Sequence, residues 1–293
     1  MAQARGTVRS GTSGWNHADW AGVVYPRGRD VDRFAAVARF VSCLEIASTF
    51  HSWPSQASVE RWSRWGHFSG LRFVALAPRA LTHSRSGPDP ELTARCRAVL
   101  EPLAEVGVLA AVLLQFPQGM HWERAAAERV RETIGLLGPL HCAVEFRHRS
   151  WSTERVLDWL ARHGVSFCNI DQPQLPGTMP PTAWHTASPA IIRLHGRHRA
   201  LWFARDGEPG RHAYRYPARE LEPWAERVSE LRRMAKETIV VATNHVGGHA
   251  LATVLKLRAL LGERGISAPP ALLTLDAELA DLGVVPDDDP PGG

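Results

Sequence analysis

Polar side chains interrupt the apolar runs of this sequence near the ends of the runs. Residues 190–195 read AIIRLH, so Arg193 and His195 stand two residues apart in a segment that is otherwise apolar. Glu145 and Arg147 have the same spacing near the end of another apolar run. Burying an ionised group alone costs much free energy, so such groups are normally paired. We therefore expect these side chains to meet in one partly buried polar cavity.

The residue types in this set suit proton transfer on an anionic ligand. Histidine titrates near neutrality, so His195 is the predicted general acid or base. Guanidinium groups form charge-assisted hydrogen bonds with phosphate or carboxylate, so Arg147 and Arg193 are predicted to clamp such a group. The acids predicted to orient groups or to serve as a carboxylate base, and thus to act in catalysis, are Glu45, Glu145 and Asp171.

Other polar or aromatic residues stand near the same strand ends or in the loops beside them. Side chains in a β-strand alternate between two faces, so Arg193 and His195 share a side, as do Asn169 and Asp171. We expect the charged members to point inward. Further predicted ligand-binding residues are Gln115, His148, Asn244 and His245 at the strand ends, Trp15 in an aromatic first loop, and Arg197 in a later loop.

Eight short β-like runs would position these residues. They cover residues 7–13, 41–48, 72–78, 108–116, 141–146, 165–171, 190–195 and 238–244. Most are continuously apolar, which is typical of parallel strands that are buried on both faces. Nearly all of the polar residues described above stand at the carboxyl ends of these runs.

Helical patterns alternate with the runs. They cover residues 30–40, 54–65, 90–107, 123–138, 152–164, 218–237 and 248–265. This alternation predicts an α/β fold and, with eight strands, a single (β/α)8 TIM-type barrel. The carboxyl ends of barrel strands converge on the face that carries active sites. The connections after strands six and seven, 172–189 and 196–216, are long, and loops of this length are usually functional or disordered.

The composition is that of a globular protein. The chain has 293 residues, 44% of them hydrophobic, and a net charge of +4. Only Lys236 and Lys256 are lysines, and the arginines are scattered, so the charge alone does not indicate a polyanionic partner. No stretch has the roughly 20 apolar residues of a membrane span, which argues against a membrane partner. The four cysteines lack metal-ligand spacing, so we expect reduced, buried thiols in a cytoplasmic protein.

Several alternatives stay open. Segment 197–216 interleaves arginines with aromatic residues, as surfaces that bind nucleic acid do, so a nucleic-acid-binding barrel is one of them. A buried salt-bridge network that only holds the barrel together is another. A divalent metal ion is a third, but the neighbouring arginines would repel it, and we predict no cofactor. The sequence does not indicate an oligomeric state.

Seven segments resemble the signature sequences of the YecE-like family, also called domain of unknown function 72. They are 11–26 (GTSGWNHADWAGVVYP), 44–55, 75–83, 113–120, 143–151 (AVEFRHRSW), 191–197 and 243–250. The resemblance implies a TIM-type barrel domain, which we place at residues 8–265 after an extension at 1–7. It adds His83 to the predicted ligand-binding residues and supplies no established activity. Residues 284–293 are acidic and rich in proline and glycine, so we expect a disordered tail.

The chain departs from the family pattern at a few positions. Ala47, His51, Leu76 and His245 stand where the pattern has asparagine, tyrosine, lysine and asparagine. Losing the lysine and the last asparagine would alter any chemistry that they perform. We expect an uncharacterised barrel enzyme that acts on a small anionic ligand, with phosphoester hydrolysis as the most concrete reaction. A family member that binds a metabolite without catalysis is the alternative.

Overall fold

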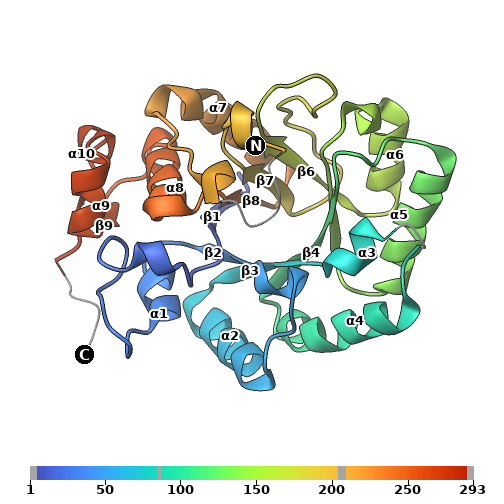
Figure 1. Ribbon diagram of the computed structural model, residues 1–293, viewed down its shortest axis with the longest axis horizontal. Coiled ribbons are helices and arrows are strands. Elements are labelled where there is room, and N and C mark those ends of the chain that lie inside the picture. Colours follow the sequence, from blue (N-terminus) through green and yellow to red (C-terminus); the bar gives the residue numbers. More distant parts are fainter. Residues whose placement is uncertain (1–4, 85–86, 204–208, 289–293) are drawn as a thin grey trace.

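Eight parallel strands close into a barrel in the computed structural model, which describes residues 5–84, 87–203 and 209–288 (Figure 1). The strands pair in chain order, and β8 pairs with β1 to close the ring. Their bounds are β1 Thr7–Ser13, β2 Cys43–Ile46, β3 Arg72–Leu76, β4 Leu109–Phe116, β5 Cys142–Phe146, β6 Ser166–Asp171, β7 Ala190–Leu194 and β8 Glu237–Ala242. The predicted TIM-type (β/α)8 barrel is confirmed.

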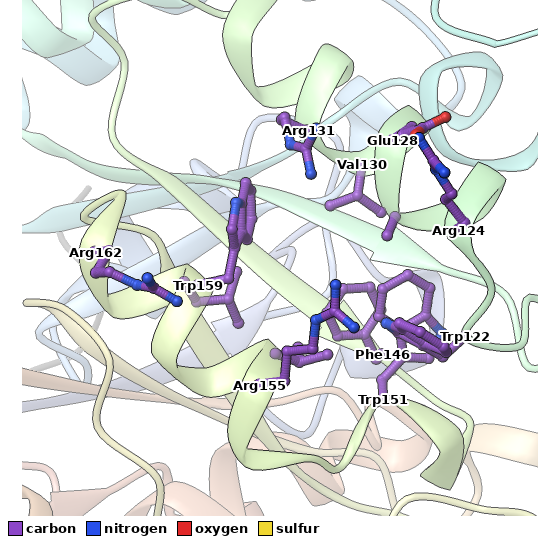
Figure 2. A pocket seen from close by; sticks show the side chains of 13 residues that line it. Trp122, Arg124, Glu128, Val130, Arg131, Phe146, Trp151, Arg155, Trp159 and Arg162 are labelled. Carbon is purple, nitrogen blue, oxygen red and sulfur yellow. The ribbon is translucent and has the colours of Figure 1, made fainter.

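Helices surround the barrel, as the alternating pattern predicted. Their bounds are α1 Arg33–Ala38, α2 Gln56–Ser69, α4 Pro90–Glu105, α5 Arg124–Leu136, α6 Glu154–Arg162, α7 Ala218–Met234 and α8 His249–Leu260. Side-chain caps begin several of them: Ser55 accepts a hydrogen bond from the Ser58 amide at the start of α2, and Asp89 accepts from the Leu92 amide in α4. A short helix that was not predicted, α3 Arg79–His83, follows β3. Figure 2 shows a groove between α5 and α6 on the outside of the barrel.

The connection between β6 and β7 contains neither helix nor strand, in agreement with the predicted long loop at 172–189. Asn169 of β6 fastens this loop to the strand. Its amide nitrogen donates to the Trp184 carbonyl at 3.0 Å, and its side-chain oxygen accepts from the Thr182 hydroxyl at 2.7 Å. The outer side of β6 therefore meets polar groups of this loop in addition to α6.

The connection after β7 has only short 3-10 turns in its described part, η4 Arg199–Leu201 and η5 Pro209–His212. Residues 204–208 lie outside the described residues. Trp202 and Tyr216 are both buried, so this loop is packed onto the barrel on either side of that gap.

The chain continues past the predicted domain end at residue 265 into a small packed unit. It contains β9 Ser267–Ala268, α9 Pro270–Leu275, α10 Glu278–Asp281 and β10 Val285–Pro286, which pairs with β9. The predicted disorder over 284–293 is therefore wrong for its first residues, because Val284 is buried and Asp287 forms an ion pair with Arg39. Residues 289–293 lie outside the described residues.

The cysteines lie in the core, as the sequence predicted. Cys43, Cys96, Cys142 and Cys168 are buried and free. In the part of the chain that the structure describes, no helix is both long enough and apolar enough to cross a membrane.

Candidate active site

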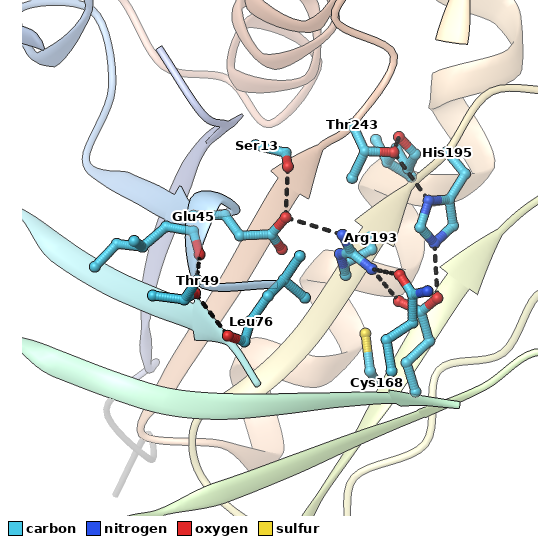
Figure 3. Close-up of polar contacts among 12 residues, drawn as sticks. Ser13, Glu45, Thr49, Leu76, Cys168, Arg193, His195 and Thr243 are labelled. Carbon is cyan, nitrogen blue, oxygen red and sulfur yellow. Dashed lines mark hydrogen bonds and ion pairs between the residues drawn. The ribbon is translucent and has the colours of Figure 1, made fainter. Parts of the chain in front are cut away.

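Arg193 lies at the centre of the polar cluster, between two carboxylates inside the barrel (Figure 3). Its Nη2 donates to Glu45 Oε1 at 2.9 Å, and its Nη1 donates to Glu145 Oε2 at 2.5 Å. The Ser13 hydroxyl donates to the same Glu45 oxygen at 2.5 Å. Ser13 and Glu45 are register partners on β1 and β2, so the sheet itself places them side by side.

A second arginine and an amide complete the cluster on the β4–β5 side. Arg147 Nε donates to Glu145 Oε1 at 2.9 Å, and its Nη2 donates to the Gln115 side-chain oxygen at 3.2 Å. The same oxygen accepts from Arg193 Nη1 at 3.1 Å. Gln115 and Glu145 are register partners, which brings β4 into the cluster.

The cluster balances its charges without solvent. Glu45 and Glu145 are fully buried, Arg193 is 3% exposed and Arg147 is 8% exposed. Burial alone would raise the pKa of Glu145, but Arg193, Arg147 and the hydrogen bond from His195 outweigh burial and hold that pKa well below its usual range. Two carboxylates therefore face two guanidiniums, and the site is neutral when His195 is neutral.

His195 joins the cluster to the end of β8. Its Nε2 lies 3.1 Å from Glu145 Oε1, and its Nδ1 lies 2.9 Å from the Thr243 hydroxyl. Burial is the main reason that the pKa of His195 is lowered to about 3, so the ring is neutral at neutral pH. An ionised carboxylate only accepts hydrogen bonds, so the proton of the neutral ring sits on Nε2. Nδ1 is then the free base, and it accepts from Thr243.

Trp202, from the loop after β7, covers this cluster. The Arg147 guanidinium lies over its ring at 5.2 Å from the centroid, and the His195 ring meets it edge-on at 5.9 Å. Trp202 is 3% exposed, so the loop closes the barrel mouth above the polar groups.

Several buried polar atoms around the mouth have no hydrogen-bond partner among the described residues. They are Glu45 Oε2, Arg193 Nε, His212 Nδ1 and His245 Nδ1. Buried polar atoms are normally satisfied by protein, water or a ligand. A water molecule or a polar ligand can supply the missing partners of these atoms.

Asp171 does not belong to the cluster, contrary to the prediction. Its register partner is Leu194, whereas Arg193 pairs with Ile170, so Asp171 faces the outside of the barrel. There its carboxylate accepts from Arg197 Nε at 2.8 Å and from the Tyr216 hydroxyl at 2.6 Å. Arg197 also belongs to this outer group and not to the centre.

Asn244 and His245, the predicted ligand-binding residues at the end of β8, lie in different surroundings. The Asn244 amide donates to the Tyr214 carbonyl and to the Thr253 hydroxyl, so it ties the β7 loop to α8. His245 stacks between His17 and His212, with ring centroids 4.3 Å and 4.9 Å away. This stack lies at the mouth and joins three loops.

Three further predicted residues lie away from the centre. Trp15 packs edge-on against Phe34 and Trp62, so it belongs to the packing of the first two helices. His83 contacts Thr82 and Phe50 beside a separate cavity at the β2 and β3 loops. His148 stacks on His121 at 3.8 Å and bonds Ser150.

Thr243 and Trp202 are the main site residues that the sequence reasoning did not select for this site. Thr243 is uncharged and follows its strand, so no anomaly in the apolar pattern marked it. Trp202 is one of the aromatic residues of segment 197–216, and nothing in the sequence places its ring over the strand ends. Within that loop, Arg197 and Arg215 are paired with Asp171 and Asp276, which occupies guanidiniums that a nucleic acid would need.

A divalent metal ion was one of the alternatives that the sequence left open. Among residues 5–84, 87–203 and 209–288, no group of three or more histidine, cysteine or acidic side chains is placed to hold a metal ion. Glu45 and Glu145, which would be its first ligands, share Arg193 between them.

The sequence pattern of the family described as "Protein of unknown function DUF72" matches residues 9–274. This chain belongs to the DUF72 family. The resemblance drawn from the seven sequence segments is thereby confirmed, and the family's barrel is the fold described above.

Two solved structures and one further relative match this chain over most of its length. A DUF72 family protein from Thermotoga maritima MSB8 is 32% identical, with a TM-score of 0.77 over 88% of this chain and 100% of that one. One from Enterococcus faecalis V583 is 22% identical, with a TM-score of 0.77 over 88% of this chain and 96% of that one. The UPF0759 protein YunF of Bacillus subtilis (strain 168) is 26% identical over 82% of this chain and 89% of its own length.

One departure from the DUF72 pattern can be placed at the mouth. Leu76, at a position where the pattern has lysine, ends β3 and is 6% exposed. Its carbonyl accepts from the Thr49 hydroxyl at 2.6 Å. Leu76 therefore places no charge at the end of β3, and the cluster's two arginines follow β5 (Arg147) or lie in β7 (Arg193).

Proposed function

We propose that this chain is an enzyme that hydrolyses a small anionic phosphoester at the carboxyl-terminal mouth of the barrel, with His195 as the general base. The observation that carries the proposal is the hydrogen-bonded chain from Thr243 through His195 to Glu145, beside Arg147. A hydroxyl, an imidazole and a carboxylate in this order form the arrangement that activates a nucleophile in many hydrolases.

The protonation states support a base and not an acid in the resting site. Nδ1 of neutral His195 takes a proton from the attacking water through the Thr243 hydroxyl, which passes its own proton to the ring and receives one from the water. The imidazolium that forms lies against ionised Glu145, which stabilises the new charge. When the ester P–O bond breaks, the leaving oxygen recovers this proton from the ring. Protons and charge then balance over one turnover.

Arg147 is the better candidate for contacting the anion. Arg193 already donates to Glu45, Glu145 and Gln115, so its charge is used inside the protein. Arg147 is the more exposed of the two, and the Trp202 ring covers it. We infer that the ligand phosphate takes the place of this ring over Arg147, and that Arg193 holds Glu145 and Glu45 in position. This revises the expectation that both arginines clamp the ligand.

The test is a panel of phosphomonoesters and phosphodiesters, with carboxylate esters as the comparison class. We expect His195→Ala and Thr243→Val to lower kcat by about 100-fold or more on the best substrate, because general base catalysis contributes about that much. Arg147→Met should chiefly raise KM. His163→Ala removes an exposed histidine at the C-cap of α6 and serves as the matched control. Thermal unfolding of each variant shows that the fold is kept.

Two results would count against the proposal. One is the absence of turnover by the wild-type chain on every ester of the panel. The other is turnover by His195→Ala at the wild-type rate in a folded protein.

A further inference from the structure

We propose that the groove between α5 and α6 is a second binding site, and that it takes an aromatic molecule bearing one anionic group (Figure 2). The groove encloses a cavity of about 590 Å³ on the outside of the barrel. Small-molecule sites usually measure about 300–1,000 Å³.

The floor and walls of the groove are aromatic. Phe146 and Trp151 stack at its base, with ring centroids 4.0 Å apart and planes only 2° from parallel. Trp151 Nε1 already donates to the Met120 carbonyl at 2.8 Å, so the polar atom of this ring needs no further partner. Trp122 and Trp159 line the cavity farther out, and Trp122 is 37% exposed. A flat apolar ligand finds ring faces there to stack on.

The rim of the groove is positively charged. Arg131 of α5 lies over the Trp159 ring and Arg155 of α6 lies over the Trp122 ring, at 5.9 Å and 5.8 Å. In Figure 2 both guanidinium groups point into the space between the helices. No residue of the described ranges forms an ion pair or a hydrogen bond with either group.

The other charged residues that line the groove do not neutralise Arg131 and Arg155. Arg124 is paired with Glu128, which is the acidic residue of the lining. Arg162 donates to the Asp158 carbonyl, so its positive charge is not neutralised. Two unpaired guanidiniums that face each other across aromatic walls favour a carboxylate, sulfate or phosphate on an aromatic body. A cation would be repelled, and a neutral aromatic would leave the two exposed guanidiniums with water alone as their partner.

This site is separate from the barrel mouth. Phe146 belongs to β5 and faces the groove, whereas its neighbours Glu145 and Arg147 face the interior cluster. The strand wall thus stands between the two sites, and the inference does not depend on the proposed hydrolysis.

Naphthalene sulfonate, which carries no hydrolysable ester, is the probe, with naphthyl methanol as the neutral comparison. We expect isothermal titration calorimetry to show one site for the sulfonate that weakens as salt is added, and weaker binding of the alcohol. The double change Arg131→Gln and Arg155→Gln should weaken sulfonate binding about tenfold or more. Trp159→Leu should weaken both probes.

Arg64→Gln is the matched control, because Arg64 lies beside Trp65 and Phe68 on a different exposed surface of α2. This variant and His195→Ala should bind the sulfonate as the wild type does. The inference is overturned if Arg64→Gln loses as much affinity as the double variant. It is also overturned if the sulfonate fails to bind, or if the alcohol binds equally well.

Discussion

Arg193 has an unusual position, because a single buried guanidinium forms ion pairs with two buried carboxylates. Its partners Glu45 and Glu145 come from β2 and β5, so the arginine joins strands on opposite parts of the barrel. A buried ion pair adds little net stability compared with apolar packing, but removing one partner leaves an uncompensated charge. The cluster is therefore costly to break, even though it need not contribute much to the stability of the fold.

Arg193→Leu is expected to lower the free energy of unfolding by about 3–5 kcal/mol, the usual cost of removing one partner from a buried pair. Glu45 would keep only the Ser13 hydroxyl as its partner. Urea unfolding followed by circular dichroism measures the effect.

Arg147→Leu is the comparison for this prediction. It removes a donor to the same Glu145, but that carboxylate keeps Arg193 and His195. We expect a clearly smaller loss than for Arg193→Leu. Equal stability of wild type and Arg193→Leu would mean that the carboxylates take up protons or water at little cost, and that the arginine does not hold the site together.

At the scale of the strands, side chains alternate between the two faces as predicted, but the prediction of which face of β6 points inward was wrong. Asn169 and Asp171 do share a side, as their spacing predicted, yet that side is the outside of the barrel. The prediction assumed that an apolar helix covers the outside of every strand. The loop between β6 and β7 supplies polar partners for Asn169, and the loop after β7 supplies them for Asp171, so the outer side of β6 can hold an amide and a carboxylate. The sequence showed the missing helix pattern, but the register that fixes the face needs the neighbouring strand.

The barrel itself could be predicted because its signals are local and repeated. Each buried strand is an apolar run, and the helices between them carry their own caps, such as Ser55 and Asp89. The convergence of Glu45, Gln115, Glu145, Arg147, Arg193 and His195 followed from strand order alone. Trp202 and the histidine stack could not follow from it, since loops take their positions from contacts that no periodicity records.

The stack of His17, His245 and His212 predicts that the free energy of unfolding falls in acid. Burial lowers the pKa of His245 to about 4, and its unfolded value is near 6.5. Between these values the unfolded chain binds a proton that the folded chain does not, so the free energy of unfolding falls as the pH falls. His245 accounts for about 1.4 kcal/mol per pH unit of that slope. His245→Phe keeps a flat ring between His17 and His212 and should make the slope shallower by this amount.

Urea unfolding at several pH values between 6.5 and about 4 measures this slope. At pH 8 both proteins have neutral rings at these positions, so any difference there reports packing alone. Parallel curves for the two proteins would show that His245 takes up its proton in the folded state.

At the scale of the whole molecule, α8 explains why the fold extends past the predicted domain end. Every residue from Ala250 to Leu257 is buried, so this helix has no solvent-facing side. One side packs on β1 and β8, and α10 of the C-terminal unit also contacts the helix. Lys256, fully buried in α8, donates to the Tyr216 carbonyl and forms ion pairs with Asp276 and Glu278. The C-terminal unit thus holds the partners of a buried cation.

A chain that ends at residue 265 is therefore expected to be less stable than one that ends at residue 288. It loses Asp276 and Glu278, so the Lys256 ammonium keeps only the Tyr216 carbonyl, and the apolar surface under Leu272 and Leu279 is exposed. An unpaired buried charge costs about 3–5 kcal/mol, which corresponds to a fall of about 10 °C in Tm for a chain of this size. Thermal unfolding of both chains measures the difference.

The cause can be separated from simple loss of packing by Lys256→Met in both chains. In the chain that ends at residue 265 the change removes an unpaired buried charge, so it should raise the Tm. In the chain that ends at residue 288 the same change leaves Asp276 with Arg215 as its remaining partner, so it should lower the Tm. Opposite signs in the two chains would place the effect on the ion pairs. The same sign in both would mean that the C-terminal unit stabilises the barrel by covering apolar surface alone.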